Sequence, residues 1–390
     1  MTNESMYRIQ KKSKTSQARA GILETAHGKV QTPFFMPIAT KASVKTLDSF
    51  DLENFGAEII LSNTYYLMLR PGIEVIKKAK GLHKFMNWPR AILTDSGGYQ
   101  VFSLAKQRKI KEDGVEFRSH LDGKKFILTP ELSLEIQKNL GVDIAMILDI
   151  CSPYPCSKED AEESMKLTTE WAKRSKKFKL KKGQMKFGIV QGSVYSDLRL
   201  KSAEDLVKLD FDGYAVGGLA VGEPREEMFR ILKEIVPKLP EDKPRYLMGV
   251  GQPEEIVEAV RSGIDMFDCV LPTRNARHGL LYVWKKVSKL VPEFVEGQSK
   301  FHPLTGSGNK ILKESFYETI HITNEKFKKD FSPLDKNCSC HTCKNFSRAY
   351  LRHLFVAEEP LALRLATIHN VNFYLDLMRR IRGEIKEGNF

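Results

Sequence analysis

The chain has 390 residues, 42% of them hydrophobic, and a formal net charge of +13. That length is enough for one large domain or two ordinary ones, and the positive charge favours a polyanionic partner such as nucleic acid. No apolar run approaches the roughly 20 residues that span a bilayer, the N-terminal stretch has no secretory signal, and six cysteines do not make a disulfide framework, so we expect a cytoplasmic protein.

The turn TAHGKV near the N-terminus predicts a β-hairpin, and short apolar runs then alternate with amphipathic segments. Most of these runs are apolar throughout, which is typical of strands covered on both faces. There are eight: FFMPI (34–38), AEIILS (57–62), RAILT (90–94), IAMILD (144–149), FGIVQ (187–191), DGYAVGG (212–218), RYLMGV (245–250) and IDMFDCV (264–270).

Helix signals lie between the runs. Thr129 and Pro130 supply a cap and a first helical residue for the segment that follows. Ser157 and Asp160 form a capping-box-like start, and Pro253 opens PEEIVEAVRSG. The eight alternations of strand and helix predict an α/β fold, a (β/α)8 TIM barrel, with a doubly wound sheet as the alternative.

Polar residues or glycines end most of the predicted strands. In a barrel these carboxyl ends meet at one rim, where such enzymes build their active sites. Three of the ends are carboxylates and none is a histidine, which disfavours a catalytic metal and suits chemistry at an anomeric carbon. The residues are Asn63, Asp95, Asp149, Gln191, Gly217, Gly218, Gly249 and Asp268.

The stretch FDCVLPTRNAR places an acid directly beside a thiol. Asp268 is anionic at neutral pH without an activating base, whereas Cys269 needs a histidine or a helix dipole to become a thiolate. Successive side chains of a strand point to opposite faces, so only one of the two faces the barrel interior. We expect Asp268 to face inward and Cys269 to be a buried structural thiol.

Two segments near this strand suit phosphate or base contacts. GVGQPEE (249–255) runs through glycines into a helix N-terminus, where free N–H groups bind anions. TRNARHG (273–279) is predicted to be a loop whose two arginines can bind phosphates in a bidentate manner.

Cys338, Cys340 and Cys343 form C-x-C-x-x-C, which lacks one ligand of a tetrahedral zinc site. Nearby histidines that could complete it are His341, His353 and His369. A closed site of four ligands would be structural. We therefore expect a barrel with its N-terminal hairpin region at 1–284, a polar insertion at 285–320, and a small zinc-binding subdomain with C-terminal helices at 321–390.

Together, the motifs resemble those of the bacterial tRNA-guanine transglycosylases, or queuine tRNA-ribosyltransferases. The resemblance runs from about residue 8 to 385, outside the 285–320 insertion. It rests on ILSNTYYLMLRPG, DSGGYQVF, VQGS, VGGLAVGE, YLMGVGQPEE, FDCVLPTRNAR, DFSPLD and CSCHTC, in the same order as in the family.

The resemblance implies a homodimeric zinc enzyme that exchanges the wobble guanine of GUN-anticodon tRNAs (Asp, Asn, His and Tyr) for 7-aminomethyl-7-deazaguanine in queuosine biosynthesis. Asp268 matches the nucleophile that forms a covalent RNA–enzyme intermediate, and Asp95 matches the general acid and base. His369 matches the fourth ligand of one structural Zn²⁺ per subunit, with Cys338, Cys340 and Cys343.

Further residues match family contacts to the base. Asp149 would accept from its N1–H and amino edge, and Gln191 and the Gly218 amide would donate to its carbonyl edge. Leu219 would offer its carbonyl to the aminomethyl group, and Tyr99 and Met248 would sandwich the ring. The base-binding set also includes Asp95, Ser96, Gly97 and Gly98. The matching RNA-binding segments are Gly249, Val250, Gly251, Gln252, Pro253, Glu254 and Glu255, and Thr273, Arg274, Asn275, Ala276 and Arg277.

Val221 and Cys151 are of the bacterial type, while three features depart from the family pattern. The stretch from Asp268 to Cys338 is longer than the family leads us to expect. Tyr66 replaces the usual histidine, and ATKAS (39–43) differs from a GTQGT-like run. The alternative function is a noncatalytic RNA-binding accessory subunit of the same family, against which the retained carboxylates argue.

Overall fold

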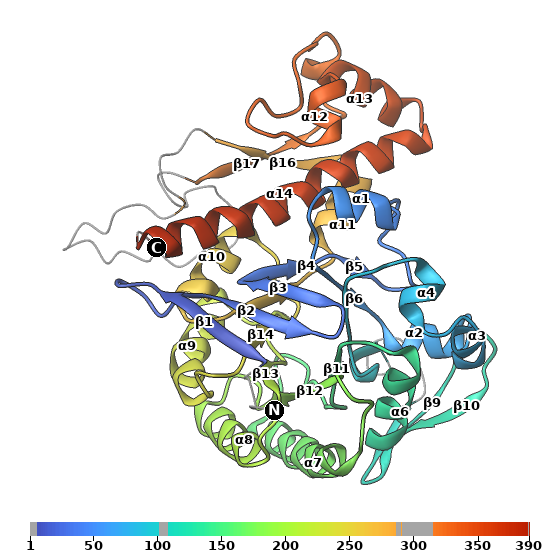
Figure 1. The fold of residues 1–390 in the computed structure, drawn as a ribbon, viewed down its shortest axis with the longest axis vertical. Helices are drawn as coiled ribbons and strands as arrows, with labels where there is room; N and C mark the ends of the chain where they lie inside the picture. The colour runs from blue at the N-terminus through green and yellow to red at the C-terminus, as the bar shows by residue number, and fades with distance from the viewer. Residues whose placement is uncertain (1–5, 101–107, 286–289, 291–314, 389) are drawn as a thin grey trace.

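Parallel strands close into a barrel in the computed structural model, which describes residues 6–100, 108–285, 290, 315–388 and 390 (Figure 1). The strand order is β4 (Phe34–Met36), β15 (Met266–Asp268), β14 (Arg245–Leu247), β13 (Gly213–Val216), β12 (Met185–Val190), β11 (Ile144–Met146), β7 (Ala91–Thr94), β6 (Ile59–Ser62) and β5 (Ile38–Ala39). The predicted (β/α)8 TIM-barrel fold is confirmed.

The barrel closes through the first predicted strand, which Pro37 divides in two. β4 pairs with β15, and β5 pairs with β6, so both ends of the sheet lie in residues 34–39. Pro37 has no N–H to give a ladder, but its carbonyl accepts from Leu61 N at 3.0 Å. The expected strand at 34–38 is therefore two short strands.

Helices surround the strands (Figure 1). The predicted starts are confirmed: Thr129 and Ser157 accept from the N–H groups of Leu132 and Asp160, and α10 begins at Pro253. The helices up to residue 277 are α1 (Ser49–Asn54), α2 (Thr64–Leu69), α3 (Ile73–Lys78), α4 (Leu82–Met86), α6 (Pro130–Leu140), α7 (Lys158–Lys177), α8 (Ser196–Lys208), α9 (Arg225–Ile235), α10 (Pro253–Arg261) and α11 (Leu271–Arg277), with the 3₁₀ turn η1 (Val236–Lys238).

A small antiparallel sheet of β1 (Tyr7–Lys12), β2 (Arg19–Thr25) and β3 (Gly28–Thr32) covers the N-terminal end of the barrel, and β2–β3 is the predicted hairpin. Its contacts are to residues that immediately precede barrel strands. Arg19 forms a buried ion pair with Asp265 at 2.6 Å, and His27 Nδ1 lies 2.8 Å from Asp143 Oδ1. With this end covered, the carboxyl ends of the strands are left for a binding site.

A second small sheet, not expected from the sequence, lies between β7 and α6. It consists of β8 (Arg108–Lys111), β9 (Gly114–Arg118) and β10 (Lys125–Leu128).

The C-terminal part combines a hairpin with helices. β16 (Leu280–Trp284) pairs with β17 (Tyr317–His321), and η2 (Glu325–Phe327), α12 (His341–Asn345), α13 (Arg348–Val356) and α14 (Pro360–Glu387) follow. The long α14 lies against α11, β16 and β4 (Figure 1). Most of the 285–320 insertion lies outside the described residues, and the three-part division of the chain stays a prediction. Among the described helices, none is long and apolar enough to cross a membrane.

Candidate active site

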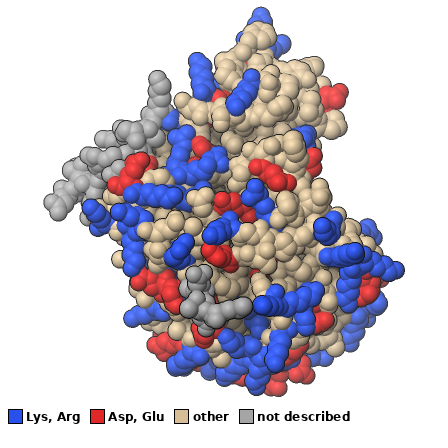
Figure 2. Space-filling model, in the orientation of Figure 1, with Lys and Arg blue, Asp and Glu red and all other residues tan. Residues whose placement is uncertain are grey.

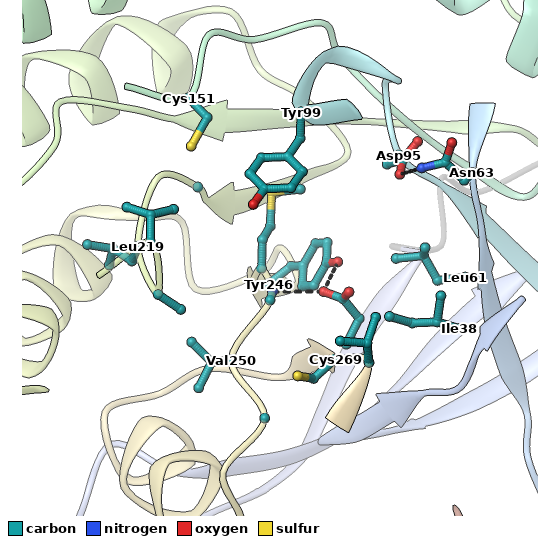
Figure 3. A pocket seen from close by; sticks show the side chains of 18 of the residues that line it. Ile38, Leu61, Asn63, Asp95, Tyr99, Cys151, Leu219, Tyr246, Val250 and Cys269 are labelled. Atoms are coloured by element: carbon teal, nitrogen blue, oxygen red, sulfur yellow. Dashed lines mark hydrogen bonds between the residues drawn. The ribbon is translucent and has the colours of Figure 1, made fainter. Parts of the chain in front are cut away.

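A pocket with a cavity volume of about 680 Å³ opens at the carboxyl ends of the barrel strands (Figure 3). Asp95, Asp149 and Asp268 all line it, although they come from three different strand ends. Pockets for small molecules commonly measure about 300–1,000 Å³, so this pocket can hold a purine. The prediction that the three carboxylates converge is confirmed.

Asp95 follows β7 and is held by three donors. The N–H groups of Thr64 and Gly97 each donate to Oδ1 at 3.1 Å, and the Asn63 amide donates to Oδ2 (Figure 3). Burial in the pocket floor raises the pKa of Asp95 to about 7, the two N–H groups lower it, and the charge of Asp268 raises it. A carboxyl group with this pKa can give or take a proton near neutral pH.

Asp268 ends β15, and both of its hydrogen bonds go to the same oxygen. Tyr246 Oη donates to Oδ1 at 2.5 Å, and Gly249 N donates to Oδ1 at 2.9 Å. Burial raises the pKa of Asp268, while these two donors lower it. Among the described residues, none donates to Oδ2, which is therefore available to react.

Cys269 does not compete with Asp268 for the role of nucleophile. Its side chain is 9% exposed and packs so closely on Gly251 that a Cβ there would lie 2.3 Å from Sγ. Burial raises the pKa of the Cys269 thiol to about 12. The thiol is protonated at neutral pH and is a poor nucleophile.

Asp149 lines another part of the pocket, and Gln191 contacts it from outside the lining. Gln191 Nε2 donates to Asp149 Oδ2 at 2.7 Å, and Ser96 Oγ donates to Oδ1 at 3.4 Å. Burial raises the pKa of Asp149 to about 6, partly offset by these two donors. Gly218 adjoins Gln191, with a left-handed φ of 62° that favours glycine.

The remaining predicted base-binding residues differ in their access to the pocket. Tyr99, 55% exposed, and Met248 line it, as do Ser96, Gly218 and Leu219. The residues Gly97, Gly98 and Gln191 are not in its lining. Gly98 is nevertheless close by, because a Cβ there would lie 3.0 Å from the Asp149 carbonyl.

The predicted RNA-contacting segments flank the pocket mouth. Gly249 to Gln252, Glu255 and Arg274 line the pocket, whereas Pro253, Thr273 and Ala276 are buried. Residues 273–277 belong to helix α11, so the expectation of a loop there was wrong. Pro272 is the second residue of that helix, where proline fits the first turn.

Sequence reasoning gave no role to Asn63 beyond a strand end and missed Tyr246. The signal for Tyr246 was its position two residues before Met248, because residues two apart on a strand share a face.

Tyr66 and the segment 39–43, which both depart from the family pattern, lie next to each other. Lys41 Nζ is 5.2 Å from the centre of the Tyr66 ring, and Tyr66 lines the pocket.

Cys338, Cys340, Cys343 and His369 come together with their ligand atoms within 4.8 Å of one another. His369 Nε2 lies 2.5 Å from the Tyr282 carbonyl, which can only accept, so Nε2 carries the proton and Nδ1 faces the sulfurs. Hydrogen bonds with the neighbouring thiols lower the pKa of Cys340, and the same neighbours raise the pKa of Cys343. This donor set fits a metal ion.

The chain is similar along its length to known proteins. A family model described as "Queuine tRNA-ribosyltransferase" matches residues 13–390. Three relatives carry the same name. The protein from Thermoanaerobacter sp. is 52% identical over 98% of this chain and 93% of its own. That from Caldanaerobacter subterraneus subsp. tengcongensis is 53% identical over 98% and 93%, and that from Listeria monocytogenes is 50% identical over 98% and 92%.

Proposed function

Because the chain belongs to the queuine tRNA-ribosyltransferase family, and is therefore a tRNA-guanine transglycosylase acting in queuosine biosynthesis, we propose how its pocket residues divide that reaction. The family implies a tRNA and a guanine analogue as substrates. The observation that carries the proposal is the pair of carboxylates with different surroundings: Asp268 with one unoccupied oxygen and Asp95 with a pKa of about 7.

In the first half-reaction, Asp268 Oδ2 attacks C1′ of the wobble nucleotide of a GUN-anticodon tRNA (Asp, Asn, His or Tyr). The C1′–N9 bond breaks, its electron pair leaves with guanine, and Asp95 donates a proton to the departing base. A ribosyl ester on Asp268 results. The carboxylate is anionic without a base to activate it, which supports its assignment as nucleophile.

In the second half-reaction, 7-aminomethyl-7-deazaguanine enters and Asp95, now a carboxylate, removes the proton from its N9. That nitrogen attacks C1′, the ester bond breaks, and the Asp268 carboxylate is restored. Two displacements retain the anomeric configuration and give ping-pong kinetics.

Base recognition is assigned to the part of the pocket around Asp149 and Gly218. The Asp149 carboxylate accepts from N1–H and the amino group, while the Gly218 amide and Gln191 donate to the carbonyl. Without a base in the site, Gln191 Nε2 donates to the Asp149 carboxylate. When the base binds, this group exchanges that acceptor for the carbonyl of the base. The Leu219 carbonyl receives the aminomethyl group, and Tyr99 and Met248 enclose the ring.

RNA contact is assigned to fewer residues than the motifs suggested. Glu254 and Glu255 form ion pairs with Arg225 at 3.1 and 2.6 Å, and carboxylates repel phosphates. The segment 249–252 and the exposed Arg274 remain at the mouth. Basic side chains are spread widely over the visible face of the molecule (Figure 2), which favours a long polyanion over a single anion.

Zinc is the ion proposed for the cysteine–histidine cluster. Three sulfurs and one nitrogen are a common tetrahedral set for structural Zn²⁺, and they leave no position open for a substrate. The ion would hold α12 to α14 and contribute to folding rather than to catalysis.

A homodimer is proposed from large apolar side chains that remain exposed. Phe50, Phe331 and Val356 are 71%, 81% and 58% exposed, and a second copy of the chain is the occupant proposed for them. Light scattering should give twice the chain mass, and F50E should shift it toward the monomer. The control is V75E, which also places a charge at an exposed apolar position, 46% exposed.

Base exchange with labelled guanine and a GUN-anticodon tRNA tests the proposed mechanism. Wild type should incorporate label and show a covalent RNA adduct on denaturing gels, and D268A should do neither. Label incorporation by D268A would exclude Asp268 as the nucleophile. Failure of the wild type to exchange would favour the alternative, a noncatalytic RNA-binding accessory subunit, against which the intact carboxylates argue.

A further inference from the structure

Arg199 is a fully buried guanidinium that lies directly behind the base-recognition wall. It is on α8, with 0% exposure, and all its hydrogen bonds go to backbone carbonyls. Nε donates to Ser193 O at 2.7 Å, Nη1 to Val190 O at 2.9 Å and to Gly217 O at 2.6 Å, and Nη2 to Gly218 O at 3.0 Å. Within the described part of the chain, it forms no ion pair with a carboxylate.

A buried charge of this kind is costly unless its donors are satisfied. Burial lowers the pKa of Arg199 to about 10, so the side chain is still charged at neutral pH. An apolar residue here would avoid the cost of a buried charge, but it would leave four backbone carbonyls without these donors. The charge thus fixes the backbone where β12 and β13 end.

The bond to Gly217 O determines the direction of the next amide. In a trans peptide the C=O and the N–H of one unit point in opposite directions. Because Arg199 holds the Gly217 carbonyl on the side away from the pocket, the Gly218 N–H of the same unit is directed toward it. Gly218 lines the pocket, and its N–H has no partner among the described residues.

The same helix holds the second donor of that wall. Arg199 Nη1 binds Val190 O at the end of β12, and Ser202 Oγ accepts from Gln191 N at 3.1 Å. Gln191 and Gly218 are in close contact, since a Cβ on Gly218 would lie 2.3 Å from Gln191 Oε1. Helix α8 thus holds both the Gly218 peptide, which lines the pocket, and Gln191, which contacts Asp149 of the lining.

We propose that Arg199 is a positioning residue for base recognition: it holds the 217–218 peptide so that the Gly218 N–H meets the carbonyl of the base. The inference rests on the proposed recognition of that carbonyl by Gly218 and Gln191. The guanidinium also polarises the peptide it binds, which strengthens the N–H as a donor when negative charge develops on the departing purine.

R199M and R199K test the role, with R245M as the matched control. Arg245 is also buried, with 7% exposure, and donates to the Leu239 carbonyl, but it begins β14 at the opposite end of the barrel. R199M should raise KM for guanine by about tenfold or more, the size of one lost hydrogen bond, while KM for tRNA changes little. R199K should lie between R199M and wild type, and R245M should leave both KM values unchanged.

Inhibition by 2-aminopurine, which lacks the carbonyl, separates positioning from general damage. Its inhibition constant should be the same for R199M and wild type, whereas guanine binding weakens. Equal weakening of both purines, or unchanged guanine kinetics in R199M and R199K, would overturn the positioning role. If R199M does not fold, R199K carries the comparison. If the wild type itself binds both purines equally, the assignment of Gly218 and Gln191 fails instead.

Discussion

The Tyr246 hydroxyl donates to Oδ1 of Asp268 at 2.5 Å, and the Gly249 N–H donates to the same oxygen at 2.9 Å. Burial raises the pKa of Tyr246 well above its usual value, with a further rise from the charge of Asp268. The phenol therefore stays protonated and donates to Asp268 at neutral pH. One carboxylate oxygen is held while the other is presented to the substrate.

Removing this donor should slow formation of the covalent intermediate. A hydrogen bond to a charged group contributes about 1.5–3 kcal/mol, so Y246F should lower kcat/KM for tRNA by about 10- to 100-fold. Y214F is the control, because Tyr214 is buried on the neighbouring strand and its hydroxyl accepts from Phe211 N. An unchanged rate in Y246F would show that Asp268 needs no support from the phenol.

The two half-reactions should respond to pH in opposite directions. The first needs Asp95 protonated, and its pKa is about 7. Esterification removes the charge of Asp268, one of the causes that raise this pKa, so Asp95 should ionise more easily in the intermediate. Above about pH 7, kcat/KM for tRNA should fall about tenfold per pH unit, whereas kcat/KM for the base should not. Parallel decline of both values in steady-state kinetics would contradict the assigned roles.

The ionised Asp149 carboxylate should lower the free energy of unfolding at neutral pH. Burial raises its pKa from 3.8 to about 6, so the folded state binds the proton more tightly than the unfolded state does. Stability is then lost as pH rises from about 4 to about 6. D149N, which cannot ionise, should gain up to about 3 kcal/mol relative to wild type over that window and nothing further above it.

Urea unfolding of D149N and wild type at several pH values measures this gain. D197N is the control, because Asp197 is exposed and its pKa is lowered by Lys158. A constant difference between D149N and wild type from pH 4 to 8 would mean that the carboxyl titrates alike in both states.

C340S should release the metal and weaken the fold. Metal analysis should find zinc in wild type and in C156S, whose thiol lies 3.4 Å from Ser193 Oγ, but not in C340S. Structural zinc contributes on the order of 10 kcal/mol in zinc-finger peptides, so the melting temperature should fall clearly. A chelator should lower the melting temperature of wild type and C156S but not that of C340S. Zinc retained by C340S would refute the ligand set.

Much of the fold could be read from local patterns. The alternation of apolar runs with capped amphipathic helices predicted the barrel, and Asp95, Asp149 and Asp268 were recognised because carboxyl strand ends share one rim. Pro37 was not recognised as a break, because its effect depends on which neighbours each half of the strand pairs with. Residues 273–277 were predicted to be a loop, but they belong to a helix whose second residue is Pro272. Proline is tolerated in the first turn of a helix as well as in a turn, so it does not distinguish the two.

The sequence by itself determined the alternation of barrel strands and helices, the strand-end carboxylates, and the three-cysteine motif. These features follow from periodicity and spacing along the chain. The spacing left three histidines as possible metal ligands, and packing of α14 brought His369 to the cysteines. Only the tertiary structure decided that Tyr246 holds Asp268 and that Arg199 lies behind Gly218, because such contacts depend on how distant segments meet.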